Sequence, residues 1–82
     1  MIEVRGQVAF LTGAAEGLGH EVARELAAAG MRLALFDVQA DKLNTLSREL
    51  TDSGADVFPI VVDLAEAGPT QDAVERALDH YG

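Results

Sequence analysis

The sequence predicts an α/β fold, in which helices cover a parallel sheet, and three observations support this prediction. Apolar runs that do not alternate with polar residues occupy positions 7–12, 32–37 and 56–63. Such runs are typical of strands that are buried on both faces of a parallel sheet. After each run, apolar residues recur at helical spacing. The resulting order of strand, helix, strand, helix, strand, helix predicts right-handed crossovers with helices packed on the sheet.

The first two helices are predicted from an apolar stripe that ends before a glycine. The first helix starts at His20 and ends before Gly30, which we expect to form a left-handed C-terminal cap. The second helix ends before Gly54. The stripes consist of Leu18, Val22, Leu26 and Ala29 in the first helix and of Leu43, Leu46 and Leu50 in the second.

Prolines help to place the third strand and the third helix. Pro59 has no backbone N–H to donate to a neighbouring strand, so we expect the third strand at an edge of the sheet. Pro69 suits the first position of the third helix, and Gly82 ends it. The apolar stripe of this helix consists of Ala73, Val74, Ala77, Leu78 and Tyr81, and we expect Tyr81 to be a packing residue.

Together these elements form a Rossmann-like β-α-β-α-β-α half of a doubly wound parallel sheet, with the expected strand order 3-2-1. The 82 residues suffice for one domain and are too few for a second, substrate-binding domain. The composition, 49% hydrophobic and 24% charged, is that of a globular protein. There is no cysteine, which excludes disulfides, a thiolate metal site and a cysteine nucleophile.

The charge excludes further classes of partner. The net charge is -8 and Lys42 is the only lysine, so we expect no nucleic-acid or anionic membrane surface. The N-terminus has no basic leader, and no apolar run approaches the ~20 residues that span a bilayer. We therefore expect a cytoplasmic protein.

Residues 12–19, with the sequence TGAAEGLG, place three glycines between the first strand and the first helix. At such a junction the free N–H groups and the positive end of the helix can bind an anion. Gly13 then serves the turn out of the strand, Gly17 the close approach of phosphates, and Gly19 the packing of the helix against the sheet. The spacing alone also fits a plain tight turn; its place between a strand and a helix favours phosphate binding.

Asp37 ends the second strand, 18 positions after Gly19, which is close to the offset of the acid that binds a ribose 2′-hydroxyl. A carboxylate there repels a 2′-phosphate, and neither Val38 nor Gln39 supplies a cation. The negative charge of Glu16 in the loop also disfavours binding of a phosphate there. These residues favour NAD over NADP. Alternatively Asp37 caps the next helix, and the two roles are compatible.

The glycine loop, Asp37 and the pair Asp63-Leu64 after the third strand resemble the short-chain dehydrogenase/reductase family, and the likeness runs from Gly6 to Gly82. It implies that Thr12 orders the loop, that the backbone from 13 to 18 lines the pyrophosphate, and that Asp63 with Leu64 contacts adenine. Asp63 is alternatively a turn residue before the third helix. The implied cofactor-binding residues are Thr12, Gly13, Ala15, Glu16, Gly17, Leu18, Gly19, Asp37, Val38, Asp63 and Leu64.

The catalytic motifs of that family are absent from these 82 residues. Asn44 is the only asparagine, which excludes the Asn-Asn-Ala-Gly stretch, and no Tyr-x-x-x-Lys pair occurs. We expect no catalytic residue and no metal ligand here, and we interpret residues 1–82 as the N-terminal, dinucleotide-binding fragment of an NAD-dependent oxidoreductase. By resemblance, the intact protein transfers hydride between nicotinamide and an alcohol or ketone. Formation of a homo-oligomer is left open. The alternatives are a free-standing adenine-nucleotide-binding module without catalysis, and a structural domain whose glycine loop is inherited architecture.

Overall fold

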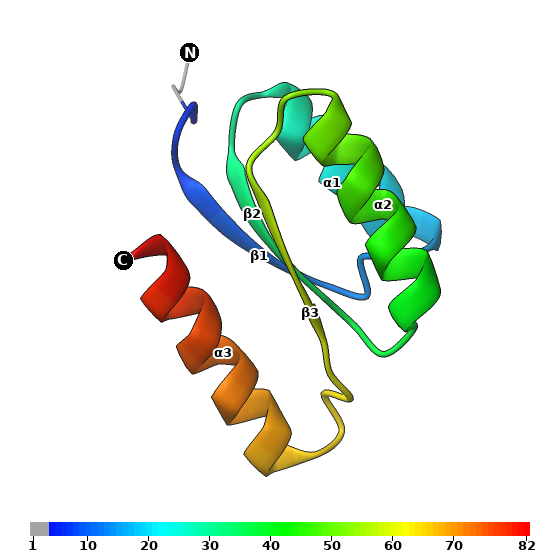
Figure 1. Ribbon diagram of the computed structural model, residues 1–82, viewed down its shortest axis with the longest axis vertical. Helices are drawn as coiled ribbons and strands as arrows, with labels where there is room; N and C mark the ends of the chain where they lie inside the picture. The colour runs from blue at the N-terminus through cyan, green and yellow to red at the C-terminus, as the bar shows by residue number, and fades with distance from the viewer. Residues whose placement is uncertain (1–3) are drawn as a thin grey trace.

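The computed structural model describes residues 4–82 and contains one parallel sheet with helices on both faces. The elements follow in the order β1 (Val8–Thr12), α1 (Gly17–Ala28), β2 (Arg32–Asp37), α2 (Ala40–Asp52), β3 (Val57–Val61) and α3 (Ala67–Tyr81). The strand order β1-β2-β3 is the expected 3-2-1 order read from the opposite edge. In Figure 1, α1 and α2 lie on one side of the sheet and α3 lies on the other. The predicted fold class is confirmed.

β2 is the central strand, and its residues alternate between two hydrophobic clusters because neighbouring side chains of a strand point to opposite faces. Leu33 and Leu35 belong to the cluster under α1 and α2, whereas Ala34 and Phe36 belong to the cluster under α3. The expectation of strands buried on both faces holds for β2. It is wrong for the two edge strands, where Phe10 is 39% exposed and Val61 is also exposed.

Pro59 lies in β3 opposite Leu35 of β2. β3 forms one edge of the three-stranded sheet, with β2 as its hydrogen-bonded neighbour. A residue without an N–H is tolerated there because the outer side of the strand has no ladder to complete. The predicted edge position is confirmed.

The first helix begins earlier than its apolar pattern predicts. α1 starts at Gly17, not at His20, so Leu18 lies in the first turn and is 80% exposed. Its predicted place in the buried stripe is wrong. The end of the helix is confirmed: Gly30 has φ +87°, its N–H donates to Ala27 O over 3.0 Å, and the next N–H, of Met31, donates to Leu26 O over 3.1 Å. This is the Schellman hydrogen-bond pattern.

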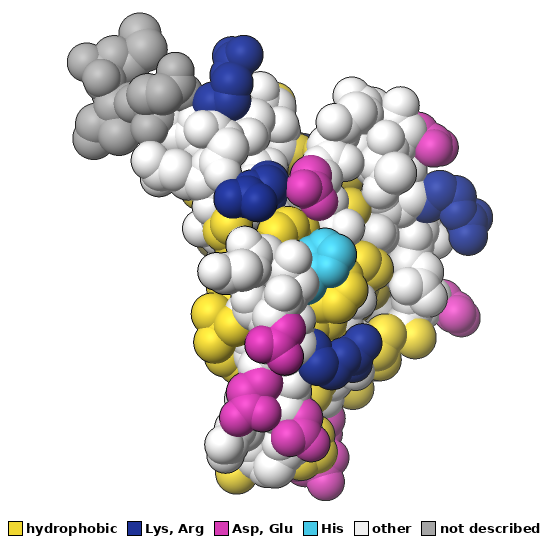
Figure 2. All heavy atoms as spheres, turned by 60° about the vertical axis from the view of Figure 1, so that its left-hand side comes forward, with side chains coloured by type: hydrophobic (Ala, Val, Ile, Leu, Met, Phe, Trp, Pro, Cys, Tyr) yellow, Lys and Arg dark blue, Asp and Glu magenta, His cyan; other side chains and the backbone are white. Residues whose placement is uncertain are grey.

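The third helix differs from its prediction in its start and in its buried face. It begins at Ala67, so Pro69 is its third residue, where a missing N–H is still harmless because the first four N–H groups have no helical partner. Ala73 and Ala77 are buried, but Val74 and Leu78 are exposed, which the stripe prediction did not expect. A helix on an edge strand buries only a narrow stripe. Figure 2 shows hydrophobic side chains at the surface on the side of the molecule where α3 lies.

Tyr81 is a packing residue, as predicted. It packs against the cluster under α3, and its hydroxyl donates a hydrogen bond of 2.9 Å to the carbonyl of Leu33. Its ring meets the edge of Phe58, on which His80 stacks with a centroid distance of 3.9 Å. Burial, together with the nearby Asp56 carboxylate, raises the pKa of Tyr81 to about 12. The phenol therefore fastens the end of α3 to the central strand.

Tyr81→Phe is expected to lower the free energy of unfolding by about 1 kcal/mol at neutral pH, because the hydrogen bond to Leu33 is lost. The raised pKa means that the stability contributed by the neutral phenol is complete below the ordinary pKa of 10.0 and is lost as pH rises toward about 12. Urea unfolding of both proteins between pH 7 and alkaline pH measures this. The stability gap should shrink above pH 10, and a constant gap would contradict the role of the hydroxyl.

Candidate functional site

The carboxyl ends of the three strands meet at one edge of the sheet, and a pocket of about 220 Å³ lies there. It is lined by residues that follow each strand: Gly13 after β1, Asp37 and Val38 at the end of β2, and Val62, Asp63, Leu64 and Ala65 after β3. Five of the predicted site residues therefore come together. This edge, beyond the carboxyl ends of parallel strands, is where open α/β sheets bind ligands.

The other predicted residues lie beside this pocket and do not line it. Thr12 is the last residue of β1, and Ala15 is buried in the loop. Glu16 is the N-cap of α1, and the three residues after it, Gly17, Leu18 and Gly19, form the first turn. Val62 and Ala65 were missed by the sequence analysis, although their positions beside the predicted Asp63 and Leu64 were the available signal.

The glycines of the loop have two different structural roles. Gly13 and Gly17 have φ of +62° and +63°, and apart from the adjoining residues and the local helix backbone no atom lies within 4 Å of the place where a Cβ would stand. Their backbone is therefore open to a ligand. At Gly19 a Cβ would lie 2.1 Å from the carbonyl oxygen of Gly13. Gly19 thus allows α1 to pack against the loop directly after β1, which corrects the expected partner from the sheet to the loop backbone.

The N-terminus of α1 is open to an anion. Glu16 has an extended backbone at the N-cap and makes no side-chain capping hydrogen bond, and the first turn contains no acidic residue. The first N–H groups of a helix have no partner within the helix, and the helix dipole is positive at this end.

Asp37 joins the glycine loop to the start of α2. One carboxylate oxygen, Oδ2, accepts a hydrogen bond of 3.0 Å from the N–H of Ala15, and Oδ1 accepts one of 2.9 Å from the N–H of Gln39. Asp37 is 7% exposed. Burial acts to raise its pKa, but the backbone hydrogen bonds outweigh it and the pKa is lowered. The N-cap of α2 is Gln39 and not Asp37, so the alternative in which Asp37 caps that helix is wrong. Its hydrogen bond to the N–H of Gln39, two residues on, instead forms an Asx turn just before the helix.

Asp63 has the geometry of its alternative, a turn residue. Its Oδ1 accepts a hydrogen bond of 3.0 Å from the N–H of Ala65, and its backbone carbonyl accepts one of 3.1 Å from Glu66, the N-cap of α3. The turn places the exposed side of Asp63 in the pocket beside Leu64.

Glu16 has a counter-ion that the sequence analysis missed. Its Oε2 forms an ion pair with Nζ of Lys42 on α2, and its Oε1 accepts a hydrogen bond of 2.9 Å from the side-chain amide of Gln39. Hydrogen bonds from Lys42 and Gln39, with the charge of Lys42, lower the pKa of Glu16. The two partners lie 23 and 26 positions along the chain, so only the packing of α2 reveals them.

The comparison with protein families matches this arrangement. A family model described as short chain dehydrogenase matches residues 7–82, nearly the whole chain. The chain belongs to the short-chain dehydrogenase family. The resemblance drawn from the glycine loop, Asp37 and Asp63 is thereby confirmed.

Individual relatives of this short-chain dehydrogenase chain are much longer. The CLA biosynthesis dehydrogenase/reductase of Lactiplantibacillus plantarum is 33% identical over 82 residues, which are 100% of this chain and 29% of the relative. The crystal structure of a short-chain dehydrogenase/reductase from Burkholderia phymatum in complex with NAD matches with TM-score 0.94 and 34% identity, over 100% of this chain and 29% of that one. A metagenomic short-chain oxidoreductase in complex with NADP matches with TM-score 0.90 and 30% identity, over 99% of this chain and 37% of that one.

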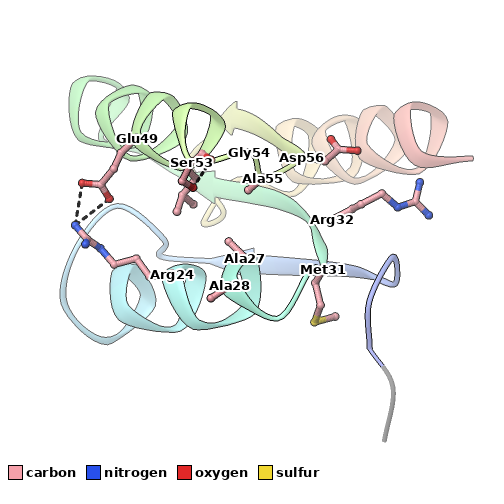
Figure 3. Close-up of a pocket in the computed structure, with 12 residues that line it drawn as sticks. Arg24, Ala27, Ala28, Met31, Arg32, Glu49, Ser53, Gly54, Ala55 and Asp56 are labelled. Atoms are coloured by element: carbon pink, nitrogen blue, oxygen red, sulfur yellow. Dashed lines mark hydrogen bonds and ion pairs between the residues drawn. The ribbon is translucent and has the colours of Figure 1, made fainter.

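A larger pocket, of about 610 Å³, lies at the opposite end of the sheet, between α1 and α2. Figure 3 shows its lining, which includes the ion pair of Arg24 with Glu49 and the side chains of Arg32 and Asp56. The chain enters β2 here, and both helices end here, so their negative dipole ends disfavour an anion. We therefore assign the candidate site to the smaller pocket, despite its size.

Two further observations concern only the described residues, 4–82. No helix among them is long and apolar enough to cross a membrane. No three His, Asp or Glu side chains among them are grouped so that they could hold a metal ion.

Gly19→Ala is expected to destabilise the protein by about 1–3 kcal/mol, because the added Cβ overlaps backbone atoms that cannot move without distorting the loop. Helix propensity alone would favour alanine by up to about 1 kcal/mol. Gly68→Ala, in the first turn of α3 with nothing within 4 Å, is the matched control and should stabilise by about 0.4–1 kcal/mol. Urea unfolding measures both, and equal gains would contradict the assigned contact.

Asp37→Asn is expected to lower the free energy of unfolding by about 1.5–3 kcal/mol at neutral pH, because two backbone N–H groups lose a charged acceptor. The lowered pKa of Asp37 means that its contribution is complete above the ordinary value of 3.8 and is lost as pH falls through the lower folded-state value. Unfolding at pH 7 and at acid pH should show the difference between the two proteins shrinking in acid. A difference that grows in acid would contradict this assignment.

Proposed function

We propose that this chain is the dinucleotide-binding part of an NAD-dependent oxidoreductase. The observation that carries the proposal is the pocket in which the Asp37 carboxylate lies beside Gly13 at the carboxyl edge of the sheet. A carboxylate with unused lone pairs suits the two hydroxyls of a ribose, and an open glycine backbone suits a phosphate.

The adenosine diphosphate part of a dinucleotide has suitable residues around this pocket. The pyrophosphate would lie along the backbone of residues 13–18, where Gly13 and Gly17 leave space, at the open N-terminus of α1. The hydroxyls of the adenosine ribose would donate hydrogen bonds to the Asp37 carboxylate, and adenine would lie between Val38, Asp63 and Leu64. The residues present therefore fit the adenosine diphosphate half of the cofactor.

The proposed preference for NAD rests on charge at the ribose. The lowered pKa of Asp37 keeps its carboxylate ionised at neutral pH, where it repels a 2′-phosphate. Val38, the adjacent side chain, is apolar, and Lys42 is held by Glu16. Of the two similar structures described above, one contains NAD and the other NADP, so the preference is argued from these residues alone.

The bound cofactor would supply hydride transfer, and the residues of this chain would bind and orient it. We further propose that residues 1–82 are the N-terminal portion of one Rossmann-type domain in a longer protein, which acts on an alcohol or ketone. The chain's 29% share of a relative's length supports this, as does the exposed Phe10 on the open edge strand β1. We propose that homo-oligomer formation is a property of that longer protein.

Val38→Arg tests the ribose assignment without removing the structural hydrogen bonds of Asp37. Val38 is 61% exposed at the rim of the pocket, so arginine can reach a 2′-phosphate there. Calorimetric titration of the purified full chain should show NAD bound more tightly than NADP in the wild type. A charged hydrogen bond of about 1.5 kcal/mol should shift the ratio of the two affinities toward NADP by about tenfold in the variant.

The matched control is Val74→Arg, which adds the same charge on α3, outside the lining of the pocket. Its ratio of NAD to NADP affinity should equal that of the wild type. Absence of any binding heat with either dinucleotide would contradict the proposed function. Sequencing the gene beyond codon 82 distinguishes an oxidoreductase from a binding module, because only an oxidoreductase of this family requires the Tyr-x-x-x-Lys pair.

A further inference from the structure

Glu16 is the point at which the glycine loop is tied to α2 by side chains alone. Both of its carboxylate oxygens are occupied, one by Lys42 Nζ and the other by the amide of Gln39 at 2.9 Å. The backbone N–H of the same Gln39 donates to Asp37. Two carboxylates from different segments therefore share one partner residue at the rim of the site.

The charges at this corner are unequal. Glu16 and Asp37 carry two negative charges, and the one lysine of the sequence, Lys42, opposes them. Asp37 is close enough to act on the pKa of Glu16 and raise it, against the larger lowering effect of Lys42. Without Lys42 the loop would present an unbalanced carboxylate next to the first N–H groups of α1. A phosphate would then meet repulsion at the helix end that should attract it.

We propose that Lys42 is a positioning residue of the dinucleotide site, which acts through Glu16 in two ways. It cancels the charge of the loop carboxylate, so that a pyrophosphate is tolerated at the N-terminus of α1. In turn, the ion pair with Glu16 keeps the Lys42 ammonium group from pairing with an adenosine 2′-phosphate. The proposal rests on the proposed function, since it concerns the same site.

A double-mutant cycle of Glu16→Gln and Lys42→Met tests the coupling, with dissociation constants for NAD and NADP measured on the full chain. Lys42→Met alone should weaken NAD binding about three- to fivefold, the upper part of the range expected for an exposed ion pair. In the Glu16→Gln background the same change should leave NAD binding unaltered, because no carboxylate remains to be balanced. Glu16→Gln alone should shift the affinity ratio toward NADP, and adding Lys42→Met should reverse that shift.

Three controls separate this role from a merely structural one. Lys42→Arg keeps the charge and should retain the wild-type affinity for NAD. The penalty of Lys42→Met should shrink at high ionic strength, since it arises from exposed charges. Arg24→Met breaks a similar exposed pair between α1 and α2, with Glu49 at 2.9 Å (Figure 3). Neither residue lines the candidate site, so this variant should leave both affinities unchanged.

Two results would overturn the proposal while the proposed function stands. One is NAD binding by the wild type together with an equal loss on Lys42→Met in both backgrounds. The other is an affinity ratio that Glu16→Gln does not change. If the wild type and all variants bind neither dinucleotide, the proposed function fails and this inference fails with it.

Discussion

The arrangement of the site depends on the hydrogen bonds of one carboxylate, that of Asp37. It comes from the end of the central strand and accepts N–H groups from Ala15 in the glycine loop and from Gln39 at the start of α2. The other side-chain link between these two segments is the exposed pairing of Glu16 with Lys42 and Gln39. A buried carboxylate that accepts two N–H groups is ionised and fixed in direction, so the unused lone pairs point from a defined position.

In the glycine loop, the close approach of α1 to the end of β1 depends on the absence of a side chain and not on a hydrogen bond. Gly19 has no Cβ, and the carbonyl of Gly13 occupies the space where one would stand. α1 therefore begins directly against the end of β1, and its N-terminal N–H groups reach the same edge as Asp37. The structural needs of the fold and those of a bound phosphate coincide here, because both require backbone that no side chain covers.

The two faces of the sheet are covered unequally. Two helices bury Leu33 and Leu35 on one face, whereas α3 alone covers the other, over β2 and β3. Phe10 on β1 and Leu78 on α3 keep exposed apolar surface in consequence. This surface is one of the two observations behind the proposal that these residues belong to a longer protein, the other being that they cover 29% of a relative's length.

By itself the sequence determined the order of the elements, the parallel sheet with an edge at Pro59, the glycine loop and the position of Asp37 at a strand end. These features follow from local periodicity and from the rule that the carboxyl ends of parallel strands share one edge. Exposure of the third helix was mispredicted, because apolar periodicity does not say how wide a sheet lies beneath a helix.

Only the tertiary structure decided which side chains meet across the glycine loop. The pairing of Glu16 with Lys42 depends on how α2 lies against the start of α1, and the contact of Gly19 with Gly13 depends on how closely that helix approaches the strand. Such contacts join residues through space at distances set by packing, and no spacing along the chain encodes them.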